Sequence, residues 1–139
     1  MDEQKNSAGD FVVEEGYDLA GQVIGLAMKV HRVLGPGFIE SVYHEALRLE
    51  LEQAGMAYEN EKPLQVIYEG RVVGEFKADM IVEGQLIVEI KAVQSLLKAH
   101  DVQLVNYLTA TGVDFGLLLN FGSSKLEFRK KFREYKAKT

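Results

Sequence analysis

The sequence predicts one α/β domain in which helices pack on a mixed β-sheet. Three observations support this fold class. Apolar residues recur at helical spacing early in the chain, the spacing then changes to about two residues, and a nearly all-apolar strand follows a third helical stretch. With 139 residues and 47% apolar composition, the chain is long enough to bury a core and too short for a second folded unit.

Three segments carry the helical pattern. Each ends at a glycine, a residue typical of helix ends. The predicted helices are residues 17–34 before Gly35, residues 40–54 before Gly55 and residues 97–111 before Gly112. Residues 1–16 lack this periodicity, so we expect a flexible N-terminal tail.

Other segments have strand character, with alternating or continuous apolar residues between turn signals such as Glu69-Gly70 and Glu83-Gly84-Gln85. The predicted strands are residues 64–68, 71–76, 78–82, 86–93, 115–121 and 125–128. The expected element order is therefore α-α-β-β-β-β-α-β-β, in one domain over residues 17–130.

Composition excludes several classes of site. The chain has no cysteine, which removes disulfides, thiolate zinc sites and cysteine nucleophiles and suits a reducing compartment. The N-terminal segment is acidic and polar, and apolar runs such as residues 116–119 are far too short to span a bilayer. We therefore expect a cytoplasmic protein without a membrane partner.

Charge is distributed unevenly along the chain. The net charge is −5, yet residues 123–139 carry seven Lys or Arg against two Glu, or +5, which leaves −10 on the remainder. This basic C-terminal segment, with a tail over residues 131–139, suits phosphate binding and equally suits a solvated tail that maintains solubility. If it binds DNA, replacing Arg129, Lys130 and Lys131 with alanine should flatten the salt dependence of binding.

Two carboxylates are placed symmetrically about a predicted turn. Asp79 and Glu89 are ten residues apart, and Gly84 lies at the centre of that interval. A three-residue loop with a left-handed glycine would pair Val82 with Leu86, Met80 with Val88 and Asp79 with Glu89. Cβ atoms of cross-strand neighbours lie about 4.5–5.5 Å apart, so both acids could ligate one oxygen-seeking cation. A two-residue turn would instead put the acids on opposite faces, so the site depends on register.

Lys91 lies on the same predicted strand face as the two acids. It follows Glu89 by two residues, and strand alternation returns it to that side. The opposite face is apolar: Ala78, Met80, Val82, Leu86, Val88, Ile90 and Ala92. Like-charged carboxylates that face each other need a cation between them. A divalent metal ion and the Lys91 ammonium would each supply that charge, so the residues alone leave a metal site and a salt-bridge cluster open.

Several motifs resemble those of a known superfamily. The matching residues are Asp79, Glu89 and Lys91 in D-x(9)-E-x-K, Gly37, Glu40 and Tyr43 in G-x-x-E-x-x-Y, Gln103 and Tyr107 in Q-x-x-x-Y, and residues 116–122, GLLLNFG. Together they resemble the GxxExxY family of small bacterial proteins, which is placed in the PD-(D/E)XK nuclease superfamily. The resemblance covers residues from about 20 to 129 and implies a restriction-endonuclease-like core.

The resemblance also implies an all-oxygen metal site. Its ligands would be Asp79, Glu89, the backbone carbonyl of Ile90 and Glu40, and oxygen ligands favour Mg²⁺ or Mn²⁺ over zinc. Lys91 would orient or help to deprotonate the attacking water, or offset charge in the transition state. Glu40 also lies in the first turn of its predicted helix, where a carboxylate stabilises the helix dipole whatever its function.

Three further side chains would contact the substrate under this resemblance. Gln103 and Tyr107 share one face of the third predicted helix, although a polar stripe of this kind is also typical of solvent exposure. Tyr43 shares a helix face with Glu40 and suits packing as well as a phosphate contact.

The sequence thus predicts a metal-dependent nuclease that hydrolyses phosphodiester bonds, in DNA rather than RNA. The alternative is a non-catalytic nucleic-acid-binding or assembly module that retains the nuclease fold, which the acidic body and small size favour. The complete Asp79, Glu89 and Lys91 set favours the enzyme, because a module without catalysis has no chemical need of all three. A domain of this size grips little nucleic acid alone, and a homodimer or a partner protein would extend that grip.

Overall fold

Three helices and five strands make up the fold in the computed structural model, which describes residues 8–133, with side chains from residue 18 onward. The bounds are α1 Ala8–Leu34, α2 Glu40–Gln53, β1 Tyr58–Tyr68, β2 Arg71–Val82, β3 Leu86–Lys91, α3 Lys98–Thr111, β4 Phe115–Asn120 and β5 Glu127–Phe132. Within the described residues, no helix is long and apolar enough to cross a membrane.

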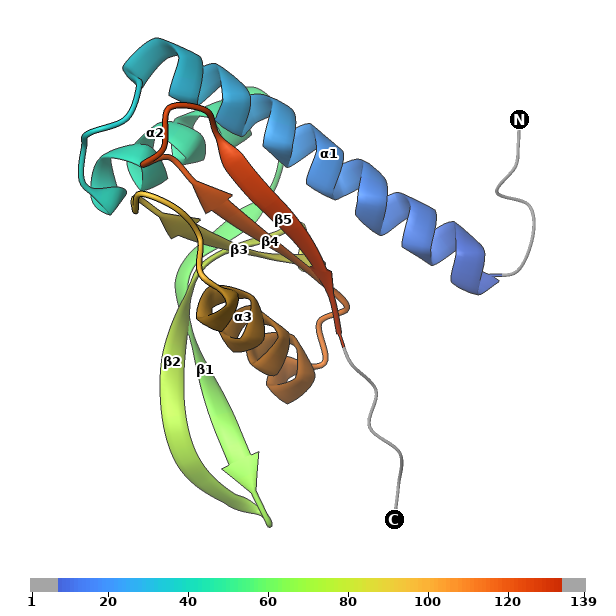
Figure 1. Ribbon diagram of the computed structural model, residues 1–139. Coiled ribbons are helices and arrows are strands. Elements are labelled where there is room, and N and C mark those ends of the chain that lie inside the picture. The colour runs from blue at the N-terminus through green and yellow to red at the C-terminus, as the bar shows by residue number, and fades with distance from the viewer. Residues whose placement is uncertain (1–7, 134–139) are drawn as a thin grey trace.

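The strands form one mixed sheet in the order β1-β2-β3-β4-β5. β1, β2 and β3 are antiparallel neighbours, β3 and β4 run parallel because α3 connects them, and β5 returns antiparallel at the edge. Helices α1 and α2 cover one face of the sheet, and α3 covers the other (Figure 1). The fold is therefore the mixed α/β arrangement expected from the sequence, in three layers.

Two apolar clusters fill the spaces between these layers. The larger lies under α1 and α2 and includes Val23, Leu47 and Val88. The smaller lies under α3 and includes Ile87 and Leu104. Strand β4 is buried along its whole length because it has a helical layer on each face, which explains its continuous apolar sequence.

The structure corrects several predicted boundaries. The segments predicted as separate strands at residues 71–76 and 78–82 form one strand, β2, so three strands rather than four precede α3. They are continuous because β2 pairs with β1 along almost its whole length before it reaches β3. The last strand was expected at residues 125–128 and lies at Glu127–Phe132.

Described elements overlap both of the predicted terminal tails. Helix α1 begins at Ala8, within the segment predicted as a flexible tail, and residues 1–7 of that segment lie outside the described residues. The basic tail predicted over residues 131–139 begins inside β5, and residues 134–139 also lie outside the described part.

Strands β1 and β2 extend beyond the rest of the sheet as a long hairpin (Figure 1). Apolar side chains are exposed at its tip: Ile67, Tyr68, Val72 and Val73. On one side of the hairpin, Leu64 packs against the cluster under α3. The base of the same hairpin carries Asp79, so β2 links the projecting tip to the candidate site.

Candidate active site

The turn between β2 and β3 has the register predicted from the sequence. Val82 pairs with Leu86, and Gly84 lies in the left-handed region at φ +66°. Glu83 also has a positive φ of +54°, which the sequence did not predict. The register excludes the two-residue turn that would have separated the acids.

Asp79 and Glu89 meet where β2 and β3 separate. The strand pairing ends at Met80 with Val88, and the next positions are joined through side chains instead. Oε2 of Glu89 accepts a hydrogen bond from the N–H of Asp79 (3.2 Å), and Oδ2 of Asp79 accepts one from the N–H of Ile90 (2.7 Å). The two carboxylates therefore lie together as expected, and each also replaces a backbone hydrogen bond of the sheet.

The separation coincides with an irregularity in the neighbouring strand. The pairing of β1 with β2 skips Glu61 and Asp79, and Glu61 has a φ of +49°. Positive φ is uncommon for glutamate and marks a local bend. Side-chain alternation changes here as well. Ala78 packs under α3, whereas the sequence placed it on the apolar face with Met80, which packs under α1 and α2.

Burial gives Glu89 a high proton affinity. The residue is 6% exposed, and desolvation, together with the charge of Asp79, raises the pKa of its carboxyl to about 8. The N–H of Asp79 and the ammonium of Lys91, at the end of β3, act in the opposite direction without cancelling this effect. The Glu89 carboxyl therefore keeps its proton to a higher pH than an exposed glutamate does.

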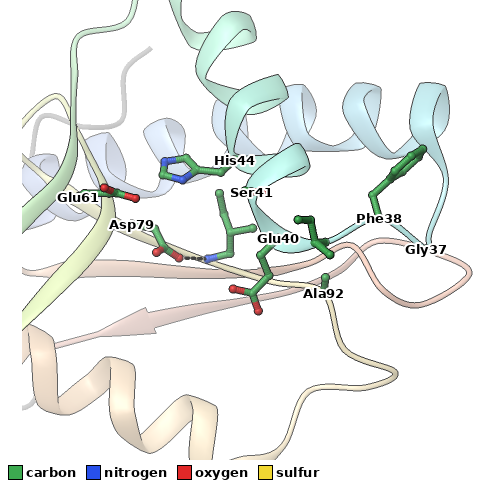
Figure 2. Close-up of a pocket in the computed structure, with 10 residues that line it drawn as sticks. Gly37, Phe38, Glu40, Ser41, His44, Glu61, Asp79 and Ala92 are labelled. Carbon is green, nitrogen blue, oxygen red and sulfur yellow. Dashed lines mark hydrogen bonds between the residues drawn. The ribbon is translucent and has the colours of Figure 1, made fainter.

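A cavity of about 640 Å³ opens beside Asp79. Glu40, from the first turn of α2, and Glu61, from β1, line this cavity on either side of Asp79 (Figure 2). His44, one helical turn after Glu40, lines it as well. The sequence indicated Glu40 but missed Glu61, because the strand was expected to begin only at Leu64.

The donor chemistry of these residues suits a hard divalent cation. Asp79, Glu89 and the carbonyl of Ile90 offer only oxygen atoms, and a bound cation would favour the ionised form of the Glu89 carboxyl, whose pKa burial raises. Within residues 18–133, however, no three His, Cys, Asp or Glu side chains are arranged so that they could hold a metal ion. The structure brings the predicted ligands Asp79 and Glu89 together and puts Glu40 on the same cavity, without forming a ready ligand cage.

Helix α3 brings Tyr107 close to the acid pair. Burial and the charges of Glu89 and Asp79 raise the pKa of its phenol. Its ring stacks on Phe76 of β2, with ring centroids 3.7 Å apart. Gln103, one turn earlier on α3, is exposed. Phe76 had no signal in the sequence, because its contact joins the hairpin to a helix far along the chain.

Tyr43 belongs to the core, which corrects its predicted contact with substrate. Its side chain is 0% exposed, and its ring stacks on Phe121 with centroids 4.6 Å apart. The hydroxyl donates to the carbonyl oxygen of Gly35 (2.6 Å) and accepts from the N–H of Phe38 (3.1 Å). Tyr43 therefore fixes the loop that leads into Glu40.

Two basic residues of β5, Arg129 and Lys131, are engaged in ion pairs. Asp101 of α3, which is buried, bonds to Arg129 and lies 3.4 Å from Nζ of Lys131. Arg133, just after the strand, pairs with Asp114 (2.8 Å). These contacts reduce the positive field expected from this segment.

A family model described as the PD-(D/E)XK nuclease superfamily matches residues 17–132. The chain belongs to this superfamily. PD-(D/E)XK nucleases generally use divalent metal ions. The matched range includes Asp79, Glu89 and Lys91.

Solved structures support the same fold for this PD-(D/E)XK protein. Three chains match it. One of them, titled as the crystal structure of SSO0001, has a TM-score of 0.56 and 21% sequence identity over 69% of this chain. The match covers 50% of that chain, so the present protein spans about half the length of this solved relative. No curated protein matches the chain.

Proposed function

We propose that this protein is a metal-dependent nuclease that hydrolyses phosphodiester bonds, with DNA favoured over RNA. The observation that carries the proposal is the meeting of two carboxylates, one of them almost fully buried, beside Lys91 and an open cavity. A purely structural pair gains nothing from burying a carboxyl so that its pKa rises to about 8, whereas strongly perturbed carboxyl groups cluster at functional sites. The Gly37, Glu40 and Tyr43 motif leads us to assign the chain to the GxxExxY branch of the superfamily.

The proposed metal ligands are Asp79, Glu89 and the carbonyl of Ile90, with Glu40 from the cavity wall. Bound Mg²⁺ or Mn²⁺ would lower the pKa of a water molecule and neutralise charge on the phosphate. Lys91 would orient that water and offset the charge that develops on the phosphate oxygens. The water oxygen bonds to phosphorus as the ester P–O bond breaks, and the leaving oxygen takes up a proton.

Substrate contacts are proposed for α3. Tyr107 lies next to the acids, and exposed Gln103 lies one turn away on the same helix. Both can donate hydrogen bonds to phosphate oxygens. The stacked ring of Phe76 extends this surface toward the hairpin.

The direct test is cleavage of single-stranded DNA, double-stranded DNA and RNA with Mg²⁺ or Mn²⁺. We expect metal-dependent cleavage of DNA by the wild-type protein and its loss in Lys91→Ala. Lys125→Ala is the matched control, because Lys125 is an exposed lysine outside the site. Cleavage that persists in Lys91→Ala would point to a contaminating nuclease and would reject the proposal.

The alternative is a non-catalytic nucleic-acid-binding or assembly module that keeps the fold. Two observations favour it: the carboxylates already bond to backbone amides, and within residues 18–133 no three candidate side chains form a metal cage. Binding of nucleic acid without cleavage in the presence of either Mg²⁺ or Mn²⁺ would support this alternative. Size measurements with and without DNA would show whether a homodimer forms.

A further inference from the structure

A buried polar network joins the ends of three strands beside Lys91. Asn120, at the end of β4, is 0% exposed, and its Oδ1 accepts a hydrogen bond from the N–H of Val93 (2.9 Å). Its Nδ2 donates to Oε1 of Glu127 (2.8 Å), and the same oxygen accepts from the N–H of Leu96 (3.0 Å). Asn120 and Glu127 together hold the loop that follows Lys91.

The backbone beside this network is tightly fixed as well. Lys91 lies in register with Asn120, and its carbonyl oxygen accepts from the N–H of Phe121 (2.9 Å). Gly122 donates its N–H to Oδ1 of Asn120 (3.0 Å) and packs so closely on Val93 that an added Cβ would lie 2.3 Å from its carbonyl oxygen. Residues 120–122 therefore set the main-chain position at Lys91.

We propose that Asn120 is a positioning residue that, through its bond to Glu127, sets the Lys91 ammonium relative to Asp79 and Glu89. The inference rests on the proposed nuclease function, in which Lys91 acts on the water and the phosphate. The held loop also leads into α3, which carries Tyr107, so one network fixes two sides of the site. A misplacement of about 1 Å can lower a rate by about 100-fold.

Glu127 is the ionisable partner of Asn120. Three other ionisable groups lie near the network. Lys91 lies opposite Asn120 on β3. His31 of α1 bonds to the carbonyl of Ser123 (2.9 Å), and Arg129 of β5 bonds to Asp101 of α3. A carboxylate at position 120 would therefore face Glu127 directly, and when both are ionised they repel. The repulsion releases the N–H of Leu96 and frees the loop.

The test compares Asn120→Asp, Glu127→Gln and the double variant Asn120→Asp with Glu127→Gln. The double variant exchanges the amide and the carboxylate between the two positions. The amide at position 127 then donates to the carboxylate at position 120, and its oxygen accepts from the N–H of Leu96. We expect kcat of Asn120→Asp, relative to wild type, to fall by about tenfold from mildly acidic to alkaline buffer. KM should change less than kcat, and the double variant should recover wild-type kcat.

Amide hydrogen exchange of Val93 and Leu96 gives a readout that does not depend on activity. Exchange should accelerate in Asn120→Asp at alkaline pH and return to the wild-type rate in the double variant. Wild-type kcat in folded Asn120→Asp despite accelerated exchange would overturn the proposal. If Asn120→Asp does not fold, the double variant tests the proposal by itself. Impaired kcat in the double variant would contradict it, because that variant keeps the hydrogen bond between positions 120 and 127. An inactive wild-type protein with the expected exchange pattern would reject the nuclease function while supporting the network.

Discussion

Glu89 is the residue at which the site and the stability of the fold are most directly opposed. Its carboxyl has an ordinary pKa near 4.5 when exposed and about 8 in the fold. Between these two values the folded state binds more protons than the unfolded state, so stability falls as pH rises through this window. Well above pH 8 the buried charge is fully present, and Glu89 then destabilises the metal-free fold most.

Glu89→Gln should therefore stabilise the metal-free protein at high pH. We expect the free energy of unfolding to rise by about 2 kcal/mol or more near pH 9, and to change little near pH 4. Urea unfolding in a chelator at several pH values measures this. Glu75→Gln, an exposed glutamate on β2, is the control. Parallel pH profiles for wild type and Glu89→Gln would contradict the assigned cause.

Tyr43→Phe separates a packing role from a substrate contact. Loss of the hydroxyl leaves the carbonyl of Gly35 and the N–H of Phe38 without this partner, while the stack on Phe121 remains. We expect a loss of about 1–2 kcal/mol in the free energy of unfolding and no change in KM. Tyr68→Phe, at 64% exposure, should change neither quantity. A raised KM with unchanged stability would restore the substrate role.

At the scale of elements, the end of β4 governs the position of β3. Gly122→Ala would push a methyl group into the backbone of Val93, which cannot move aside as a flexible side chain would. We expect a loss of about 3 kcal/mol in stability, measured by thermal and urea unfolding. Gly25→Ala in α1 is the matched control. Its Cβ meets nothing within 4 Å, so it should stabilise the helix by about 0.5–1 kcal/mol.

Local signals in the sequence predicted the helices and strands well, and predicted the contacts between distant segments poorly. The turn at Gly84 fixed the register of Asp79 and Glu89 because short-range backbone chemistry sets hairpin pairing. The irregularity at Glu61 could not be predicted, since it depends on the pairing of β1 with β2 and the sequence carries no turn signal at that position. Pairing with β1 along almost its whole length likewise makes β2 one continuous strand.

Contacts between distant segments explain the other differences. Phe76 reaches Tyr107 only after the hairpin folds back over α3, and Asn120 reaches Val93 only after the α3 crossover closes. The GLLLNFG segment was visible as a pattern, but its role depends on the neighbouring backbone. Charge counting likewise overestimated the basic segment, because Asp101 lies elsewhere in the sequence.

At the scale of the whole molecule, the ion pairs on β5 change the expected response to salt. Arg129→Ala with Lys131→Ala should lower stability, since both residues contact buried Asp101, and should leave the salt dependence of DNA binding nearly unchanged. Lys98→Ala, an exposed lysine at the start of α3, should reduce the slope of log Kd against log salt by about one. A flatter slope in the double variant would show that these residues contact phosphate after all.

The hydrogen bonds from the backbone amides of β2 and β3 hold the carboxylates of Asp79 and Glu89 in place. A cation that draws Asp79 and Glu89 toward itself must release the amides of Ile90 and Asp79, and each unpaired amide costs about 1–3 kcal/mol. The resting protein should consequently bind free Mg²⁺ weakly. Occupancy would rise once a phosphate group supplies further oxygen ligands, which would tie metal loading to the arrival of substrate.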